Sequence, residues 1–270
     1  MFFRKKLWLG ISAALVTGSA LASSDVLDAE DATQGHNMVH IKSNAAGEGG
    51  EGGEGGEGGE TGSVVADTDT GYLTLLGLMR GHLNVGLDLY RSGAHDAAAT
   101  HMKHPGDELY KDLVAGLESR GASGFGEELA ALAKVVGSRG SVAEADAAYE
   151  AVLKAITNAE AAAGKRDAKT QAAVIVGLVK TAAEEYDIAV EKGQIVNGHE
   201  YQDALGFVRV AQDMAETLDA ANTEAVEEIR RQLKNLIALW PGVVPPETTQ
   251  TAPPAVYGAA ARIELAALSL

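Results

Sequence analysis

The sequence predicts an all-α protein, a multi-helix bundle in which helical hairpins could stack on one another. Apolar residues recur at the spacing of a helical face from Tyr72 to Trp240. Alternating strand patterns are scarce over the same residues, and residues that end or begin helices separate the helical stretches. A segment of this length is sufficient for one substantial hydrophobic core.

The first helix is expected to begin at Tyr72 and to end at the turn Ser92–Gly93, because apolar residues repeat on one face between them. A short second helix should end before Pro105, since the residue preceding a proline is disfavoured in helical conformation. Pro105 itself suits the first turn of a third helix. In chain order, the expected helices cover about 72–91, 94–102, 105–120, 126–136, 141–163, 168–192, 198–220 and 223–240.

Two of these helices have clear start signals. Ser141 and Glu144 have the spacing of a capping box, in which each side chain bonds to the backbone N–H of the other residue. Asn197 is a good N-cap for the helix over 198–220, and Lys192–Gly193 is a plausible end for the helix before it.

Residues 1–22 are expected to be a cleavable export signal. A basic stretch, Arg4–Lys6, precedes an apolar run over 7–16 and a small-residue cleavage site at Ala20–Ala22. The apolar run is too short for a membrane-spanning helix. We therefore expect a periplasmic or secreted protein.

Residues 23–70 are expected to form a disordered acidic tail. Its centre is a Glu-Gly-Gly repeat over 47–60, and glycine at this density costs too much entropy to order. His36, Met38 and His40 form a weak metal-binding pattern within the tail. The helical domain is expected over 71–240, followed by a Pro-containing C-terminal segment over 241–270. This segment is expected to wrap around the domain or to extend as a tail, and to end in a short helix at 257–268.

The composition excludes several classes of function. The formal net charge is −16, so the surface repels phosphate backbones and nucleic acid is not an expected partner. The chain has no cysteine, which excludes disulfides, thiolate metal sites and iron–sulfur clusters. No nucleophile elbow, phosphate-binding loop, HExxH motif or dinucleotide fingerprint is present, so the sequence offers no positive argument for an enzyme.

Three histidines are predicted to meet within the first helical hairpin. His82 lies ten residues before the turn at Ser92–Gly93. His101 lies eight residues after this turn, and His104 eleven. At a rise of about 1.5 Å per residue these positions reach nearly the same height, so His82 is expected to face His101 or His104. Glycines of the first helix would allow a neighbouring helix to approach closely, namely Gly77, Gly81 and Gly86.

The candidate metal ligands are these histidines together with Glu108, beside His104, and Met79, one turn before His82. Nitrogen and oxygen donors of this kind suit iron, zinc or manganese. If Met79 and Met102 take part, copper becomes a candidate, because thioethers favour soft metals.

A stretch in the C-terminal half carries a family resemblance, over about residues 174–218. It contains Glu185-Tyr186-Asp187, then a glycine turn, then His199-Glu200-Tyr201-Gln202-Asp203. This arrangement resembles the helical extracytoplasmic domain that precedes the membrane part of bacterial high-affinity iron permeases. In that domain a Tyr-containing acidic patch is followed by a glycine turn and a Glu-Tyr-x-Glu/Asp helix start.

The resemblance implies a role beside iron transport, with iron as the metal and an inner-membrane iron permease or another transport component as partner. The permeases' membrane helices and paired-glutamate iron motif are absent from this sequence, so we expect only the soluble domain. The motifs at 184–187 and 200–203 are open to a functional role, or to a structural one as a solvated acidic face with packed tyrosines. The alternative function is a helical scaffold that binds a partner protein without metal.

Overall fold

The computed structural model describes residues 64–164 and 166–270. The expected export signal, the histidine pattern at 36–40 and the Glu-Gly-Gly repeat lie outside these residues. The end of the expected tail is described and belongs to the fold: Ala66 is buried, and the first helix begins at Asp69, a few residues earlier than expected.

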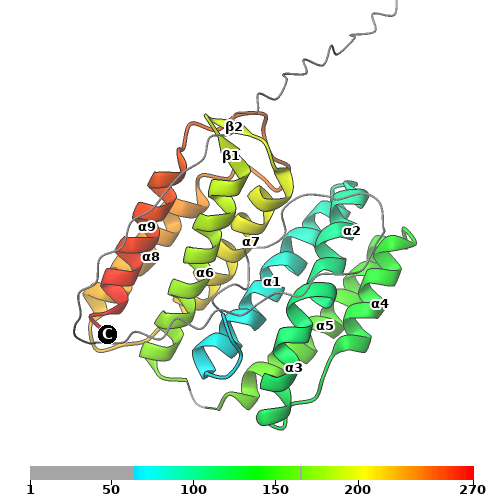
Figure 1. Cartoon of the computed structure of the whole chain (residues 1–270), viewed down its shortest axis with the longest axis horizontal. Coiled ribbons are helices and arrows are strands. Elements are labelled where there is room, and N and C mark those ends of the chain that lie inside the picture. Colours follow the sequence, from blue (N-terminus) through cyan, green and yellow to red (C-terminus); the bar gives the residue numbers. More distant parts are fainter. Residues whose placement is uncertain (1–63, 165) are drawn as a thin grey trace, which may run out of the picture. The chain divides into compact units, whose positions relative to one another are not determined.

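The described helices fall into two groups (Figure 1). We call the first group the N-terminal layer; it comprises α1 (Asp69–Arg91), α2 (His95–His104), the π-helix η1 (Pro105–Leu109), α3 (Tyr110–Ser119), α4 (Gly126–Gly137) and α5 (Val142–Ala162). We call the second group the C-terminal bundle; it comprises α6 (Ala168–Ala189), α7 (Gly198–Glu216), α8 (Thr223–Ile237) and α9 (Pro253–Ala267). The all-α prediction is confirmed.

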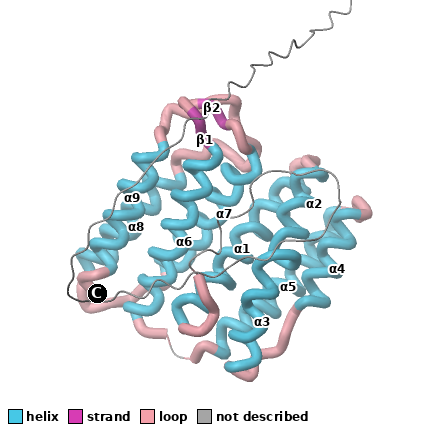
Figure 2. Tube along the Cα trace, viewed as in Figure 1, coloured by secondary structure: helices cyan, strands magenta, loops and turns pink. Residues whose placement is uncertain are grey.

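A single β-hairpin interrupts the helices that are described (Figure 2). Its strands β1 (Val190–Glu191) and β2 (Gln194–Ile195) pair antiparallel, with Val190 opposite Ile195. Lys192 and Gly193 both have positive φ, 52° and 79°, as a two-residue hairpin turn requires. The turn expected at Lys192–Gly193 is therefore present, but α6 has already ended at Ala189.

Helix α1 lies between the two groups, as Figure 1 shows. It packs against α6 and α7 on one side and against α2 and α5 on the other. Most of its residues are buried, which explains why its sequence is apolar on nearly every face. The two groups therefore share one continuous core, with α1 at its centre.

The predicted helix starts are confirmed. Ser141 and Glu144 make both bonds of the capping box at the start of α5. At the start of α7, the Asn197 side-chain oxygen accepts from the backbone N–H groups of His199 and Glu200. These local signals need no tertiary contacts, which is why the sequence predicts them well.

The expected helix break before Pro105 does not occur. His104 keeps helical dihedrals, φ −49° and ψ −50°, and α2 continues through η1 into α3. The backbone N–H of Tyr110 donates to the carbonyl of Pro105, five residues back, which is π-helix spacing. This wider turn takes up the proline, which has no N–H to donate, without ending the helix.

The Pro-containing C-terminal segment contributes a full bundle helix. Pro253 begins α9, consistent with the preference for proline in a first helical turn. α9 packs against α6 and α8, and Lys180 of α6 pairs with Glu264 of α9 at 2.6 Å. None of the described helices is both long enough and apolar enough to cross a membrane.

Candidate metal centre

Four histidines and one aspartate converge where the N-terminal layer meets α7. His82 comes from α1, and His101 and His104 come from α2. His199 and Asp203 come from the first turns of α7. The ring centroids of His82 and His104 lie 4.9 Å apart, and those of His101 and His199 stack at 4.1 Å.

Asp203 is the centre of this cluster. Its side chain is completely buried, and its Oδ1 lies 2.6 Å from Nδ1 of His82 and 2.9 Å from Nδ1 of His101. Its Oδ2 lies 3.3 Å from Nδ1 of His199. Although these nitrogens are close, neither carboxylate oxygen accepts a hydrogen bond of acceptable geometry from any of the described residues. A buried carboxylate needs compensating charge, and here three imidazoles from three helices surround it.

The tautomer of His101 is set by a chain of hydrogen bonds. Gln202 donates from Nε2 to the carbonyl of Val243 at 3.0 Å, which turns its Oε1 toward His101. That Oε1 lies 2.9 Å from Nε2 of His101, so Nε2 carries the ring proton. In neutral His101 the lone pair of Nδ1 therefore points at the carboxylate of Asp203. Two lone pairs at 2.9 Å repel each other unless a proton or a metal cation lies between them.

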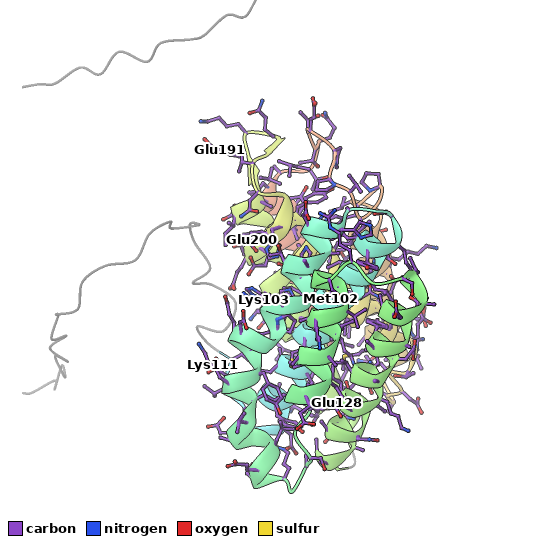
Figure 3. The ribbon with its side chains drawn as sticks, turned by 90° about the vertical axis from the view of Figure 1, so that its right-hand side faces the viewer. Met102, Lys103, Lys111, Glu128, Glu191 and Glu200 are labelled. Atoms are coloured by element: carbon purple, nitrogen blue, oxygen red, sulfur yellow. The ribbon has the colours of Figure 1, made fainter. Side chains whose placement is uncertain are left out.

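The outer side of the cluster is formed by His199 and Glu200. The side chain of His199 is 20% exposed, whereas that of Glu200 is 7% exposed. Glu200 Oε1 accepts from the Asn197 side chain at 3.4 Å, and its Oε2 lies 3.9 Å from His199 Nδ1. Figure 3 labels Glu200 of α7 and Lys103 of α2, the two helices that the His101–Gln202 contact joins.

The π-helix begins directly after His104. Nε2 of His104 lies 3.4 Å from Oε2 of Glu108, one turn further along. His104 is buried, whereas Glu108 is partly exposed. Because η1 replaces a break with a continuous helix, the two side chains stay on one face, with His104 toward His82. π-Helical turns recur at functional sites in proteins, and this one adjoins the cluster.

Close helix contacts bring the cluster together. A Cβ on Gly206 would lie 2.4 Å from the carbonyl oxygen of Gly81, so α1 and α7 touch backbone to backbone. Gly81 precedes His82, and Gly206 lies one turn after Asp203. Gly86 makes a similar contact with α2, since a Cβ there would lie 3.2 Å from Cβ of His101. The close approach expected at these glycines of α1 is confirmed.

The electrostatics favour an ionised carboxylate at Asp203. Burial alone would raise the pKa of Asp203, but interactions with His82 and His101 lower it overall. Burial lowers the pKa of His199 to about 4, although Asp203 opposes this shift. At neutral pH His199 is therefore uncharged, the form in which imidazole binds metals.

The donor atoms match a metal site in type and spacing. Ligand atoms of His82, His101 and Asp203 lie within 4.8 Å of one another, as do those of His199, Glu200 and Asp203. Adjacent ligands of a six-coordinate ion with bonds of about 2.1 Å lie about 3 Å apart, close to the observed separations. Two histidines with one carboxylate is the donor set of many non-haem iron(II) sites. The residues therefore fit a divalent metal of the kind that includes iron, zinc and manganese.

The structure brings together His82, His101 and His104, with Glu108 at the side of His104. Met79 lies in the hydrophobic core, as does Met102, and none of the described contacts joins either sulfur to the cluster. The thioether argument for copper therefore has no support among the described contacts. The sequence-based candidate set omitted His199, Glu200 and Asp203, which lie more than ninety residues further along the chain.

In the two acidic tyrosine motifs, the tyrosines and the acidic residues have different outcomes. Tyr186 and Tyr201 are buried, with ring centroids 5.8 Å apart, in agreement with the expected packing of tyrosines. A solvated acidic face is wrong for Glu185, Glu200 and Asp203, because all three are buried. The signal that could have identified Glu200 and Asp203 as site residues is their close spacing with His199 on the first turns of one helix.

Comparison with known proteins identifies one of the two regions. Residues 161–268 match the family model described as the iron permease-associated 4-helix bundle domain. No curated protein and no solved structure matches. The match covers less than half of the chain, but it includes α6–α9 in full, a wider region than residues 174–218. The C-terminal bundle is thus the part of this chain that corresponds to the iron permease-associated domain, and the resemblance found in the sequence is confirmed.

Proposed function

We propose that this protein is an exported metal-binding accessory of an iron-uptake system and that it binds iron at the cluster around Asp203. One observation carries the proposal. In neutral His101, the Gln202–Val243 relay turns the lone pair of Nδ1 toward a fully buried carboxylate oxygen at 2.9 Å. A metal cation between the two atoms removes this repulsion and satisfies both.

The arrangement around His101 also matches the usual support of metal ligands. A metal-bound histidine generally donates its second ring nitrogen to a fixed acceptor, which sets the tautomer and orients the ring. Gln202 fills this role for His101. The choice of iron rests on the match of the C-terminal bundle to the iron permease-associated domain and on the two-histidine, one-carboxylate donor set.

The proposed partner is an iron permease or another component of the same transport system. The expected export signal would place the chain on the side of the membrane from which iron enters. The acidic chain, with a net charge of −16, raises the local concentration of cations at its surface. In this role the protein binds the ion and presents it to the transporter without changing it chemically.

The test is a calorimetric titration of the metal-depleted protein with Fe²⁺ under anaerobic conditions, repeated with Mn²⁺ and Zn²⁺. We expect binding at micromolar or lower metal concentration, weakened at least 100-fold by Asp203→Asn, which preserves the shape of the side chain. His95→Ala is the matched control, because His95 lies on α2 but contacts Tyr90 at 4.6 Å. Equal binding by the wild type and by Asp203→Asn would contradict the proposal and favour an imidazolium–carboxylate pair.

A further inference from the structure

Building on the proposed function, we infer that the cluster has two cation positions that share Asp203 as a bridging ligand. The inner position is bounded by His82 and His101 with Asp203 Oδ1. The outer position is bounded by His199 and Glu200 with Asp203 Oδ2. The ligand is a pair of divalent cations, with ferrous iron as the physiological one.

The argument begins with the two oxygens of Asp203. Oδ1 is directed at the nitrogens on α1 and α2, whereas Oδ2 is directed at the nitrogen on α7. Both oxygens are buried and neither makes a directional hydrogen bond among the described residues. One cation at the inner position would satisfy Oδ1 alone. Carboxylates that bridge two metals use one oxygen for each, and the metals then lie about 3.5–4 Å apart.

The outer position has its own supporting contacts. The Asn197 side chain holds one oxygen of Glu200, with the other on the side of His199. His199 stacks on His101 with ring planes only 18° apart, which fixes its ring beside the inner position. Its Nε2 is buried and lacks a hydrogen-bond partner in the described chain.

The two positions differ in access. The inner histidine side chains have no exposed surface, whereas His199 is 20% exposed. An ion arriving from solvent therefore meets the outer position first. Because both positions hold the same carboxylate, an ion can pass inward by exchanging Oδ2 for Oδ1 of Asp203. The outer position thus serves as the entry site and the inner position as the retaining site.

The experiment counts bound metal in the full chain and measures the distance between ions. Metal-depleted protein is loaded anaerobically with Fe²⁺, and the number bound is measured by native mass spectrometry. X-ray absorption then tests for iron–iron scattering at about 3.5–4 Å. We expect two ions in the wild type and one in Glu200→Gln and in His199→Gln. Glu191→Gln is the matched control, because this exposed carboxylate lies on the nearby hairpin, and it should retain both ions.

The outcomes separate the two claims. A wild type that binds no metal overturns the proposed function. A wild type that binds one ion, unaffected by Glu200→Gln, overturns only the second position. The bridged pair is also overturned if the wild type binds two ions without iron–iron scattering. It is likewise overturned if both outer-position variants retain two ions. Circular dichroism spectra identical to wild type establish that the variants are folded, and the two variants provide independent readings of the same position.

Discussion

The C-terminal bundle and the N-terminal layer differ in what they bring to the cluster. The bundle, which matches the iron permease-associated domain, supplies one histidine and two carboxylates from the start of α7. The layer lies outside that match, apart from the last residues of α5, and supplies three histidines from α1 and α2. Neither region alone surrounds Asp203. The proposed metal centre is therefore a property of the seam between them, where α1 contacts α7.

This difference teaches where to look for function in a chain with a partial family match. At one end of the bundle, Tyr186, Tyr201 and Trp240 pack together. The seam instead holds a fully buried carboxylate among imidazoles, an arrangement that is costly unless a cation or a proton compensates the charge. In the proposed centre, the extra helices of the layer are thus not only a support for the bundle, because they supply the histidines that complete the ligand set.

The largest expected effect concerns the core of each region. Ile156 of α5 and Ile263 of α9 are fully buried, one in the layer and one in the bundle. Replacing either with alanine should lower the free energy of unfolding by about 2–5 kcal/mol, measured by urea denaturation. The affinity of the folded protein for metal should change less than threefold. A selective loss of metal binding in Ile156→Ala or Ile263→Ala would mean that the site depends on the remote core.

The next effect tests the seam directly. Gly206→Ala places a methyl group 2.4 Å from the Gly81 carbonyl oxygen, and neither backbone can yield without separating α1 from α7. We expect a loss of about 1–3 kcal/mol in unfolding free energy, together with weaker metal binding.

Gly258→Ala is the matched control for the seam substitution. Gly258 lies inside α9, and the nearest atom to an added Cβ is the end of the flexible Arg262 side chain at 3.4 Å. Alanine there should be neutral or stabilising by up to about 1 kcal/mol. Equal stabilities for Gly206→Ala and wild type would show that the helices are not in backbone contact.

A smaller effect concerns the orientation of His101. Gln202→Leu removes the acceptor that fixes the tautomer, so metal affinity should fall about 10–100-fold in a titration with Fe²⁺. Gln171→Leu is the control, because Gln171 bonds to the Met214 carbonyl at 2.7 Å and touches no member of the cluster among its described contacts. If both variants bind metal as the wild type does, Gln202 does not position the ligand.

The smallest effect concerns the partly exposed ion pair across the seam. The side chain of Arg209 on α7 lies 2.8 Å from that of Asp88 on α1. Removing this ion pair by Arg209→Ala should lower the free energy of unfolding by about 0–1 kcal/mol. Lys180→Ala, which removes a similar pair with Glu264 inside the bundle, should cost about the same. A loss well above 1 kcal/mol for Arg209→Ala alone would mean that charge, and not glycine packing, holds the seam.

The sequence predicted the helices well because their signals are local. Capping at Ser141 and Asn197 depends on residues within one turn, and apolar periodicity identified α1 as strongly as any helix. The π-helix was missed because the rule for a residue before proline assumes α-helical hydrogen bonding, and η1 uses a wider turn.

The candidate site was predicted only in part, for a similar reason. His82, His101 and His104 share one hairpin, so counting residues from its turn places them at similar heights. Asp203 lies in a distant helix, and no local pattern shows that α7 packs on α1. Gly81 and Gly206, which make this contact, are single glycines in helices and could equally have faced other neighbours.

The most direct test of a metal centre shared by both regions is metal-dependent stability in two matched variants. At the inner position, His82→Ala removes a ligand from the layer, and Asp203→Asn removes the ligand from the bundle. In the wild type, Fe²⁺ at 100 times its dissociation constant should raise the unfolding free energy by about 2.7 kcal/mol. The account predicts that either variant loses most of this gain. Full metal-dependent stabilisation in either one would contradict it, because the inner position takes its ligands from both regions.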